Sequence, residues 1–229
     1  FTPSVNYPSL LEIERRLAGE VHDARRTVWR ADREILSQAF LEIFESLSDT
    51  SGEDLGCAED ILEDIRSLYD DLEQSPLQEE STLVTSVYAE LSESIHDLHL
   101  AAESEQTAVR VLNVYRELLR KVVDVQLQSF KEIERYLESV NDFLHDKEIV
   151  VDPNVSLYRG KAVGIQFGRD DRLDRLRALS SGERQIVTLI YAATHMSKQK
   201  VLLIDEPEIS LHVDWQRRLL GKMAEQVGE

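Results

Sequence analysis

Two short stretches of the sequence carry residues that could bind and cleave phosphate groups. The first is ALSSGERQ, residues 178–185, in which two serines and a glycine precede a glutamate and an apolar run. Small residues let backbone N–H groups converge, and the N-terminus of a helix adds a positive dipole. We expect a helix to begin near Glu183, with a phosphate bound by the Ser180 hydroxyl and by the N–H groups of Ser181 and Gly182. An ordinary serine N-cap followed by a helix-starting glutamate would produce the same pattern.

The second stretch, VLLIDE at residues 201–206, ends an apolar run with two carboxylates. The run is short and uniformly apolar, which is typical of a buried parallel strand. Ligands of open α/β sheets bind at the carboxyl ends of strands, so both acids would face a site. We expect Asp205 to hold Mg²⁺, in part through water, and Glu206 to polarise a water molecule for attack on phosphorus. An apolar strand that ends in Asp-Glu also occurs without any such function.

Long helices precede both stretches. Apolar side chains recur at helical spacing in four segments, over residues 9–47, 61–72, 83–98 and 105–145. Ser9 is the expected N-cap of the first helix, with Glu12 three positions later as its capping-box partner. Two long helices that enclose two short ones predict an arm in which the first helix leaves and the last returns as an antiparallel pair. Such an arm is an insertion, because it leaves and returns at one place.

The sequence pattern changes from helix to strand at Ile149. The segment IVVDPNVSLYRGKAVGIQFG is rich in β-branched residues and turn signals, which predicts strands. A polar connector, DDRLDRLRAL, and an apolar helix, IVTLIYAATHM, follow at residues 170–179 and 186–196. We therefore predict a helical arm over residues 1–149 and an α/β part over residues 150–229.

The order of these segments resembles the core of the ABC-type ATPases. LSSGE, residues 179–183, is similar to the signature motif of that family, and VLLIDE is similar to its Walker B strand with the catalytic glutamate. Ser210-Leu211-His212 resembles the D-loop. A histidine at that place is more typical of the RecF, SMC and OLD-like branch than of transporters. The resemblance covers about residues 150–229, and a long helical insertion between two lobes is common in that family.

The resemblance implies an ATPase that uses ATP and Mg²⁺, with ATP held between two lobes of a homodimer or a higher homo-oligomer. The residues that would contact ATP are Leu179, Ser180, Ser181, Gly182, Glu183, Ser210 and His212. Asp205 would hold the metal, and Glu206 would be catalytic. Family members with a comparably short arm occur in DNA repair and in anti-phage defence. A non-catalytic scaffold that uses ATP only to lock an assembly is the alternative, and a coiled-coil adaptor with a chance motif is a third.

One expected motif is missing from the sequence. None of the nine glycines begins a G-x-x-x-x-G-K-[ST] phosphate loop. The switch histidine of the family would also lie after Glu229. We expect the lobe with the phosphate loop to precede Phe1, so that this fragment alone would be inactive.

The charge distribution also divides the sequence into two parts. Residues 1–149 carry 33 acidic and 14 basic side chains, whereas residues 150–229 carry 11 and 12. Between Glu42 and Val109 the only lysine or arginine is Arg66. A surface so acidic repels nucleic-acid phosphates. It is either a solvated helical face or a docking surface for a basic protein partner, such as a nuclease effector.

Six arginines near the start of the first helix offer a different contact, at Arg15, Arg16, Arg25, Arg26, Arg30 and Arg33. They would pair with carboxylates of the arm or, alternatively, with DNA phosphates. The single cysteine, Cys57, rules out a disulfide within these residues and favours a reducing compartment. No apolar run approaches the roughly 18 residues of a membrane span. We therefore expect a cytoplasmic protein with no membrane contact.

Overall fold

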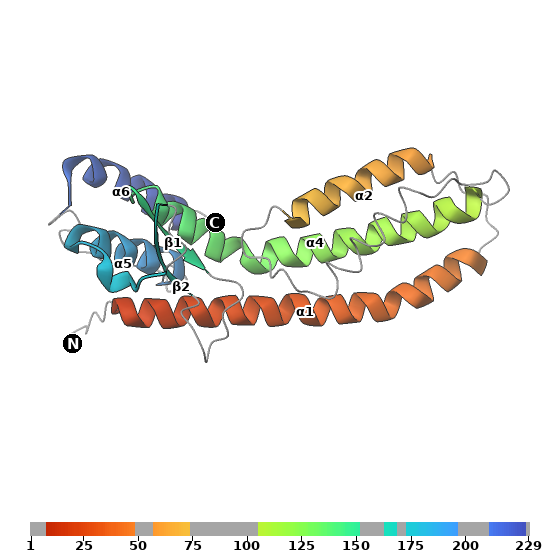
Figure 1. The fold of residues 1–229 in the computed structure, drawn as a ribbon, viewed down its shortest axis with the longest axis horizontal. Helices are drawn as coiled ribbons and strands as arrows, with labels where there is room; N and C mark the ends of the chain where they lie inside the picture. Colours follow the sequence, from red (N-terminus) through yellow and green to blue (C-terminus); the bar gives the residue numbers. More distant parts are fainter. Residues whose placement is uncertain are drawn as a thin grey trace. The chain divides into compact units, whose positions relative to one another are not determined.

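The computed structural model describes residues 8–48, 57–73, 105–151, 163–168, 173–196 and 211–227. Within these ranges the chain is mostly helical and has one small sheet (Figure 1). The elements are α1 (Leu10–Ser48), α2 (Ala58–Glu73), α4 (Glu105–Asn141), β1 (Lys147–Val151), β2 (Val163–Phe167), the short 3-10 helix η1 (Leu176–Ala178), α5 (Ser181–Met196) and α6 (Val213–Val227). None of the helices in these ranges combines the length and the apolar character that crossing a bilayer requires.

The chain forms two compact units. Phe1–His22 and Phe130–Glu229 make up the first, which we call the sheet unit, and Asp23–Ser129 make up the second, the helical unit. Helix α1 begins in the sheet unit and ends in the helical unit, and α4 runs in the opposite order. The domain division at residues 149 and 150 stays a prediction.

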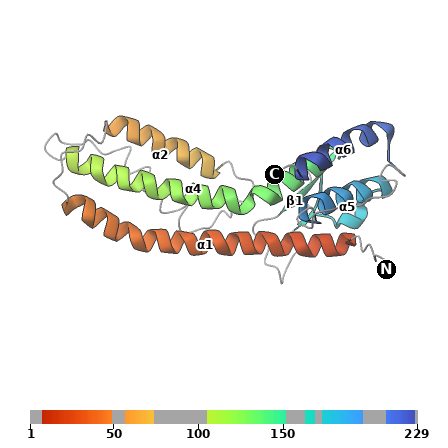
Figure 2. The same ribbon diagram turned by 180° about the vertical axis from the view of Figure 1, so that it is seen from behind.

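The helical unit has a core contributed by α1, α2 and α4. Its buried side chains include Ile35 of α1, Ile61 and Ile65 of α2, and Leu119 and Val122 of α4. Figures 1 and 2 show the three helices side by side. The apolar spacing predicted for residues 61–72 is therefore confirmed as a core face. The predicted helix over residues 83–98 lies outside the described residues.

Ion pairs join the helices of this unit at its surface. Asp64 of α2 accepts hydrogen bonds from Arg116 and Arg120 of α4, each at 3.2 Å. Lys121 of α4 contacts Glu42 of α1 at 3.3 Å. Exposed pairs of this kind contribute about 0–1 kcal/mol each, so the apolar core dominates the stability of the unit.

Asp32 is an acid in the buried face of α1. Asp32 is only 4% exposed, and its Oδ1 atom has no hydrogen-bond partner. Burial disfavours the charged carboxylate and raises the pKa of Asp32 to about 6. The folded state therefore binds a proton at this position more tightly than the unfolded chain does. Near neutral pH the carboxylate is ionised and destabilises the helical unit.

We predict that Asp32→Asn stabilises the protein at about pH 7.5, by about 1–3 kcal/mol, because it removes a buried and incompletely paired charge. The folded pKa is raised, so wild-type stability is gained as the pH falls through about 6 towards the unfolded value. The advantage of the variant should therefore shrink between about pH 7 and pH 4. Urea unfolding followed by circular dichroism at both ends of this range measures it.

Glu34→Gln is the control for this prediction, because Glu34 is an exposed acid on the same helix. It should change stability by less than about 0.5 kcal/mol at either pH. A stability difference between wild type and Asp32→Asn that stays constant with pH would contradict the prediction.

In the sheet unit, α4 ends in a tight turn that leads into β1. The helix ends at Asn141, not at His145 as predicted, because Phe143 and Leu144 donate their N–H groups to carbonyls three residues earlier. Asp146 then has a φ of 59°, which closes the turn. The side chain of Asn141 holds Ile149 by accepting from its N–H at 2.8 Å and donating to its C=O at 3.1 Å.

Strands β1 and β2 form an antiparallel hairpin, in which Ile149 pairs with Ile165. The strands predicted after the arm are therefore confirmed. On its other side Ile165 exchanges backbone hydrogen bonds with Asp174, at 2.8 and 2.9 Å. This bridge brings the polar connector against β2, and α5 follows directly after η1.

Gly164 is required by this close approach. A Cβ atom at this position would lie 2.8 Å from the Asp174 carbonyl oxygen and 2.9 Å from Leu173 Cβ. We predict that Gly164→Ala destabilises the protein by about 1–3 kcal/mol, because the backbone of the connector must move.

Gly19→Ala is the matched control. Nothing lies within 4 Å of its added Cβ, and alanine in a helix should stabilise the protein by about 0.5–1 kcal/mol relative to glycine. Thermal unfolding of both variants tests this, and equal effects would contradict it.

Candidate functional site

The stretch ALSSGERQ forms the end of η1 and the start of α5. Helix α5 begins at Ser181, two residues before the predicted start at Glu183, with Ser180 as its N-cap. The Ser180 N–H donates to Glu183 Oε2 at 2.8 Å, and the Glu183 N–H donates to Ser180 Oγ at 3.4 Å. This reciprocal capping box supports the helix from its first residue, which is why it begins earlier than expected.

The capping box leaves several donors at the start of α5. Ser180 Oγ accepts one hydrogen bond, and its own hydroxyl proton remains to be donated. The N–H groups of Ser181 and Gly182 belong to the first turn of the helix, so they have no intrahelical acceptor. Ser180 and Ser181 are exposed. Gly182, in contrast, is buried. The start of α5 therefore offers an exposed hydroxyl at Ser180 and an exposed amide donor at Ser181 to an anion, at the positive end of the helix dipole.

The LSSGE segment, residues 179–183, is held in place by the burial of Leu179 and by hydrogen bonds from Arg184, the residue that follows it. Leu179 is buried in the core, and its C=O accepts a 2.7 Å hydrogen bond from Arg184 Nε. A second bond from Arg184 reaches the carbonyl oxygen of Arg177 at 2.6 Å. Arg184 thus holds the connector onto the first turn of α5.

Glu183, the last residue of the segment, forms an ion pair with Lys147. Lys147 Nζ lies 2.9 Å from Glu183 Oε2, and the two side chains are only 17% and 11% exposed. Burial by itself would raise the pKa of Glu183, but hydrogen bonds from Lys147 and Ser180 outweigh that effect and lower the pKa. Glu183 is therefore a carboxylate at neutral pH, committed to its neighbours. No pattern along the chain points to Lys147, which stands 36 positions before Glu183.

Helix α1 supports α5 at both of its ends. Glu14 Oε1 accepts the N–H of Leu176, just before the LSSGE segment, at 2.7 Å. Near the other end of α5, Glu20 contacts His195 at 3.0 Å and Tyr191 at 3.4 Å. Burial, together with the charge of Glu20, raises the pKa of Tyr191 to about 12.

Helix α4 contacts the middle of α5 at a third point. Tyr136 OH donates to the Val187 carbonyl at 3.2 Å, and its ring meets that of Tyr191 edge to face. The parts of α1 and α4 that lie in the sheet unit therefore contact α5 through buried and half-buried polar groups. These contacts fix the orientation of α5 within the sheet unit.

Of the other predicted site residues, the structure describes His212. It is exposed and precedes α6, where its C=O accepts the N–H groups of Trp215 and Gln216. Its ring nitrogen Nδ1 lies 3.4 Å from Asp214 Oδ2. Asp205, Glu206 and Ser210 lie outside the described residues, as does the predicted strand at residues 201–206.

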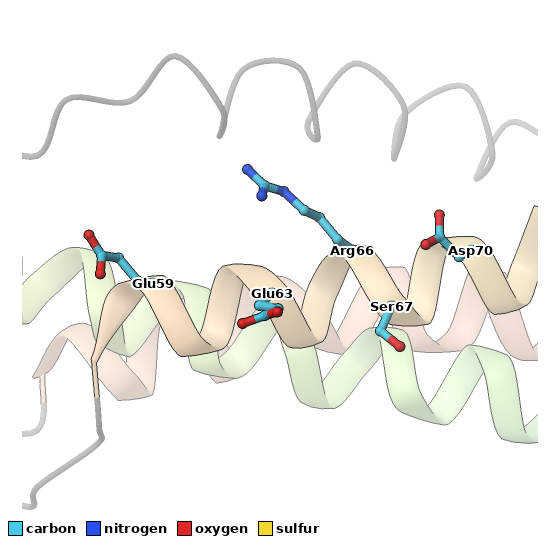
Figure 3. Close-up of a pocket in the computed structure, with 5 residues that line it drawn as sticks. All are labelled: Glu59, Glu63, Arg66, Ser67 and Asp70. Carbon is cyan, nitrogen blue, oxygen red and sulfur yellow. The ribbon is translucent and has the colours of Figure 1, made fainter.

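An open hollow of about 580 Å³ lies beside α2 (Figure 3). Among the described residues, those that line it are Glu59, Glu63, Arg66, Ser67 and Asp70 of α2. The three carboxylates and one guanidinium on this wall disfavour contact with a phosphate group. In the described ranges, no group of three histidines, cysteines or acids is arranged to hold a metal ion.

A protein-family model matches the chain from residue 3 to residue 227. The family is described as "AAA domain, putative AbiEii toxin, Type IV TA system". The chain belongs to this family. AAA domains are ATPase domains, which generally use ATP and Mg²⁺, so the family confirms the predicted ATPase class. No curated protein matches the chain.

Proposed function

We propose that this AAA-family chain is part of an ATP-driven switch, in which the LSSGE segment of one copy closes over the terminal phosphate of ATP bound to a second copy. The observation that carries the proposal is the start of α5. There, a capping box and the Lys147 ion pair hold the segment, while Ser180 and Ser181 are exposed and leave a hydroxyl and a first-turn N–H group available. Membership of an ATPase family makes ATP the phosphate ligand that best fits these donors.

Each residue of the proposed site has a defined role. Ser180 donates its hydroxyl, and Ser181 donates its amide N–H group, to the phosphate. When bound, ATP supplies the phosphoanhydride bond, and Mg²⁺ neutralises charge on its oxygens. Asp205 would hold that metal and Glu206 would polarise the attacking water, both in the copy that binds the ATP. These two roles rest on the resemblance to the RecF, SMC and OLD-like branch.

Closure of such a pair is a population shift. The terminal phosphate meets the LSSGE segment only in the closed pair, so ATP binds the closed state more tightly than the open state. A differential affinity of about 10⁴-fold would move the pair from mostly open to mostly closed. Hydrolysis removes the bridging phosphate and lets the pair open again. Helices α1 and α4, both attached to α5, would carry this change outward.

The output of the switch is proposed to be a protein effector. The family description refers to a putative toxin of a toxin–antitoxin system, which supports a role in anti-phage defence. The acidic run between Glu42 and Val109 favours a basic protein partner over DNA. Binding of duplex DNA with a steep salt dependence would overturn this choice of partner.

Light scattering of the full-length protein tests the switch itself. With ATP and Mg²⁺ under conditions of slow hydrolysis, the measured mass should rise from that of one copy to that of a pair, and ADP should not have this effect. A mass that is the same with ATP, with ADP and without nucleotide would contradict the proposal.

A further inference from the structure

A single carboxylate oxygen joins the LSSGE segment to the end of α4. Glu183 Oε2 accepts both the Ser180 N–H, at 2.8 Å, and the Lys147 ammonium, at 2.9 Å. The first bond is part of the capping box that shapes the proposed phosphate site. The second comes from the first residue of β1, six positions after the last residue of α4.

The connection from α4 to Lys147 is held on both sides. Asn141, the last residue of α4, grips both backbone groups of Ile149 in β1. Across the hairpin, Gly168 donates its N–H to Asp146 at 3.1 Å. With these contacts in place, the turn cannot absorb a displacement of the helix end without breaking hydrogen bonds. Such a displacement reaches Lys147.

The position of Lys147 is also fixed by its surroundings. Its ammonium lies 5.7 Å from the centre of the Phe167 ring, and Phe167 is its partner residue on β2. Its side chain is largely shielded from water, so the ion pair with Glu183 is screened less than an exposed pair. Removing one member of such a pair leaves the other buried and incompletely paired, which loosens the geometry that the pair held.

We infer that Lys147 is a positioning residue, through which the end of α4 sets the geometry of the LSSGE segment and so the strength of ATP-driven pairing. The inference rests on the proposed function. It requires no contact between Lys147 and the nucleotide. Coupling is reciprocal, so pairing on ATP would in turn restrain the α4–β1 turn.

Lys147→Met in the full-length protein tests the inference. ATP-driven pairing, measured by light scattering against protein concentration, should weaken about tenfold, as expected when a hydrogen bond between charged groups is lost. The affinity of a single copy for a fluorescent ATP analogue, measured at high dilution, should stay unchanged. A purely structural defect would lower both. Lys147→Arg keeps the charge and should restore pairing to within about threefold of wild type.

Lys121→Met is the matched control. Lys121 of α4 pairs with Glu42 at 3.3 Å in the helical unit, and this pair does not involve the α4–β1 turn or Glu183. It should pair on ATP as the wild type does. Should Lys147→Met fail to fold, Lys147→Gln takes its place. Its amide can keep a neutral hydrogen bond to Glu183 but carries no charge, so its pairing should weaken less than tenfold and still be weaker than that of the control variant.

The outcomes separate this inference from the proposed function. If the wild type pairs on ATP and Lys147→Met pairs no more weakly than Lys121→Met, the inference alone is overturned. A loss of ATP-driven pairing in Lys147→Arg as large as that in Lys147→Met also overturns the inference. Absence of ATP-driven pairing in the wild-type protein overturns the proposed function, and the inference with it.

Discussion

Glu206→Gln in the full-length protein should lower the rate of ATP hydrolysis by about 10²–10⁴-fold, the usual contribution of a general base. Glutamine has nearly the shape of glutamate but cannot take a proton from water. ATP binding and pairing should persist, so the variant should accumulate as an ATP-bound pair. Phosphate release measures the rate, and light scattering measures the pair.

Glu208→Gln is the control for this prediction, because it removes a nearby acid that has no proposed role. It should hydrolyse ATP at a rate close to that of the wild type. A non-catalytic scaffold would be indifferent to Glu206→Gln. An unchanged state of association and an unchanged hydrolysis rate would therefore favour the scaffold.

Ser181→Glu should abolish ATP-driven pairing without harming the fold. Ser181 is the exposed first residue of α5, where a negative side chain is favourable to the helix dipole. The same charge would face the terminal phosphate of ATP. Two unit charges about 4 Å apart near a protein surface repel by about 4 kcal/mol, which corresponds to about a thousandfold loss of pairing affinity. Sedimentation of the variant with ATP measures this loss.

Ser181→Gln separates charge from size at this position. Glutamine has the volume of glutamate but no charge, so its pairing defect should be at least about tenfold smaller. Both variants should unfold at temperatures close to that of the wild type. Equal pairing by Ser181→Glu and the wild type would show that the start of α5 does not face the phosphate.

The long helices α1 and α4 could be predicted because their apolar spacing is long and regular. Ser9 was recognised as the N-cap of α1, and its Oγ accepts the N–H of Glu12 at 3.2 Å. The end of α4 was placed too late because Phe143 and Leu144 continue the apolar spacing although they lie in the turn. The left-handed conformation of Asp146 leaves no mark in the sequence.

The LSSGE segment could be recognised from residue types, but its supports could not. Ser180 and Glu183 have the spacing of a capping box, which is a local signal for the true start of α5. Lys147 meets Glu183 only through the tertiary fold. Glu14 likewise reaches Leu176, just before the segment, from a helix whose charged residues, taken alone, indicate a solvated face. Contacts between distant residues depend on packing, which spacing along one helix does not encode.

Mixing two inactive variants tests the central claim most directly. If the LSSGE segment of one copy completes the site of another, a pair of one Ser181→Glu copy and one Glu206→Gln copy has one site with both defects and one site with neither. Glu206→Gln copies also pair with one another, and Ser181→Glu weakens one of the two sites in a mixed pair. An equimolar mixture should therefore recover less than the quarter of wild-type ATP hydrolysis that random pairing would give, but clearly more than either variant alone. A mixture that hydrolyses ATP no faster than the two variants do separately would show that the two residues do not act across a pair of copies.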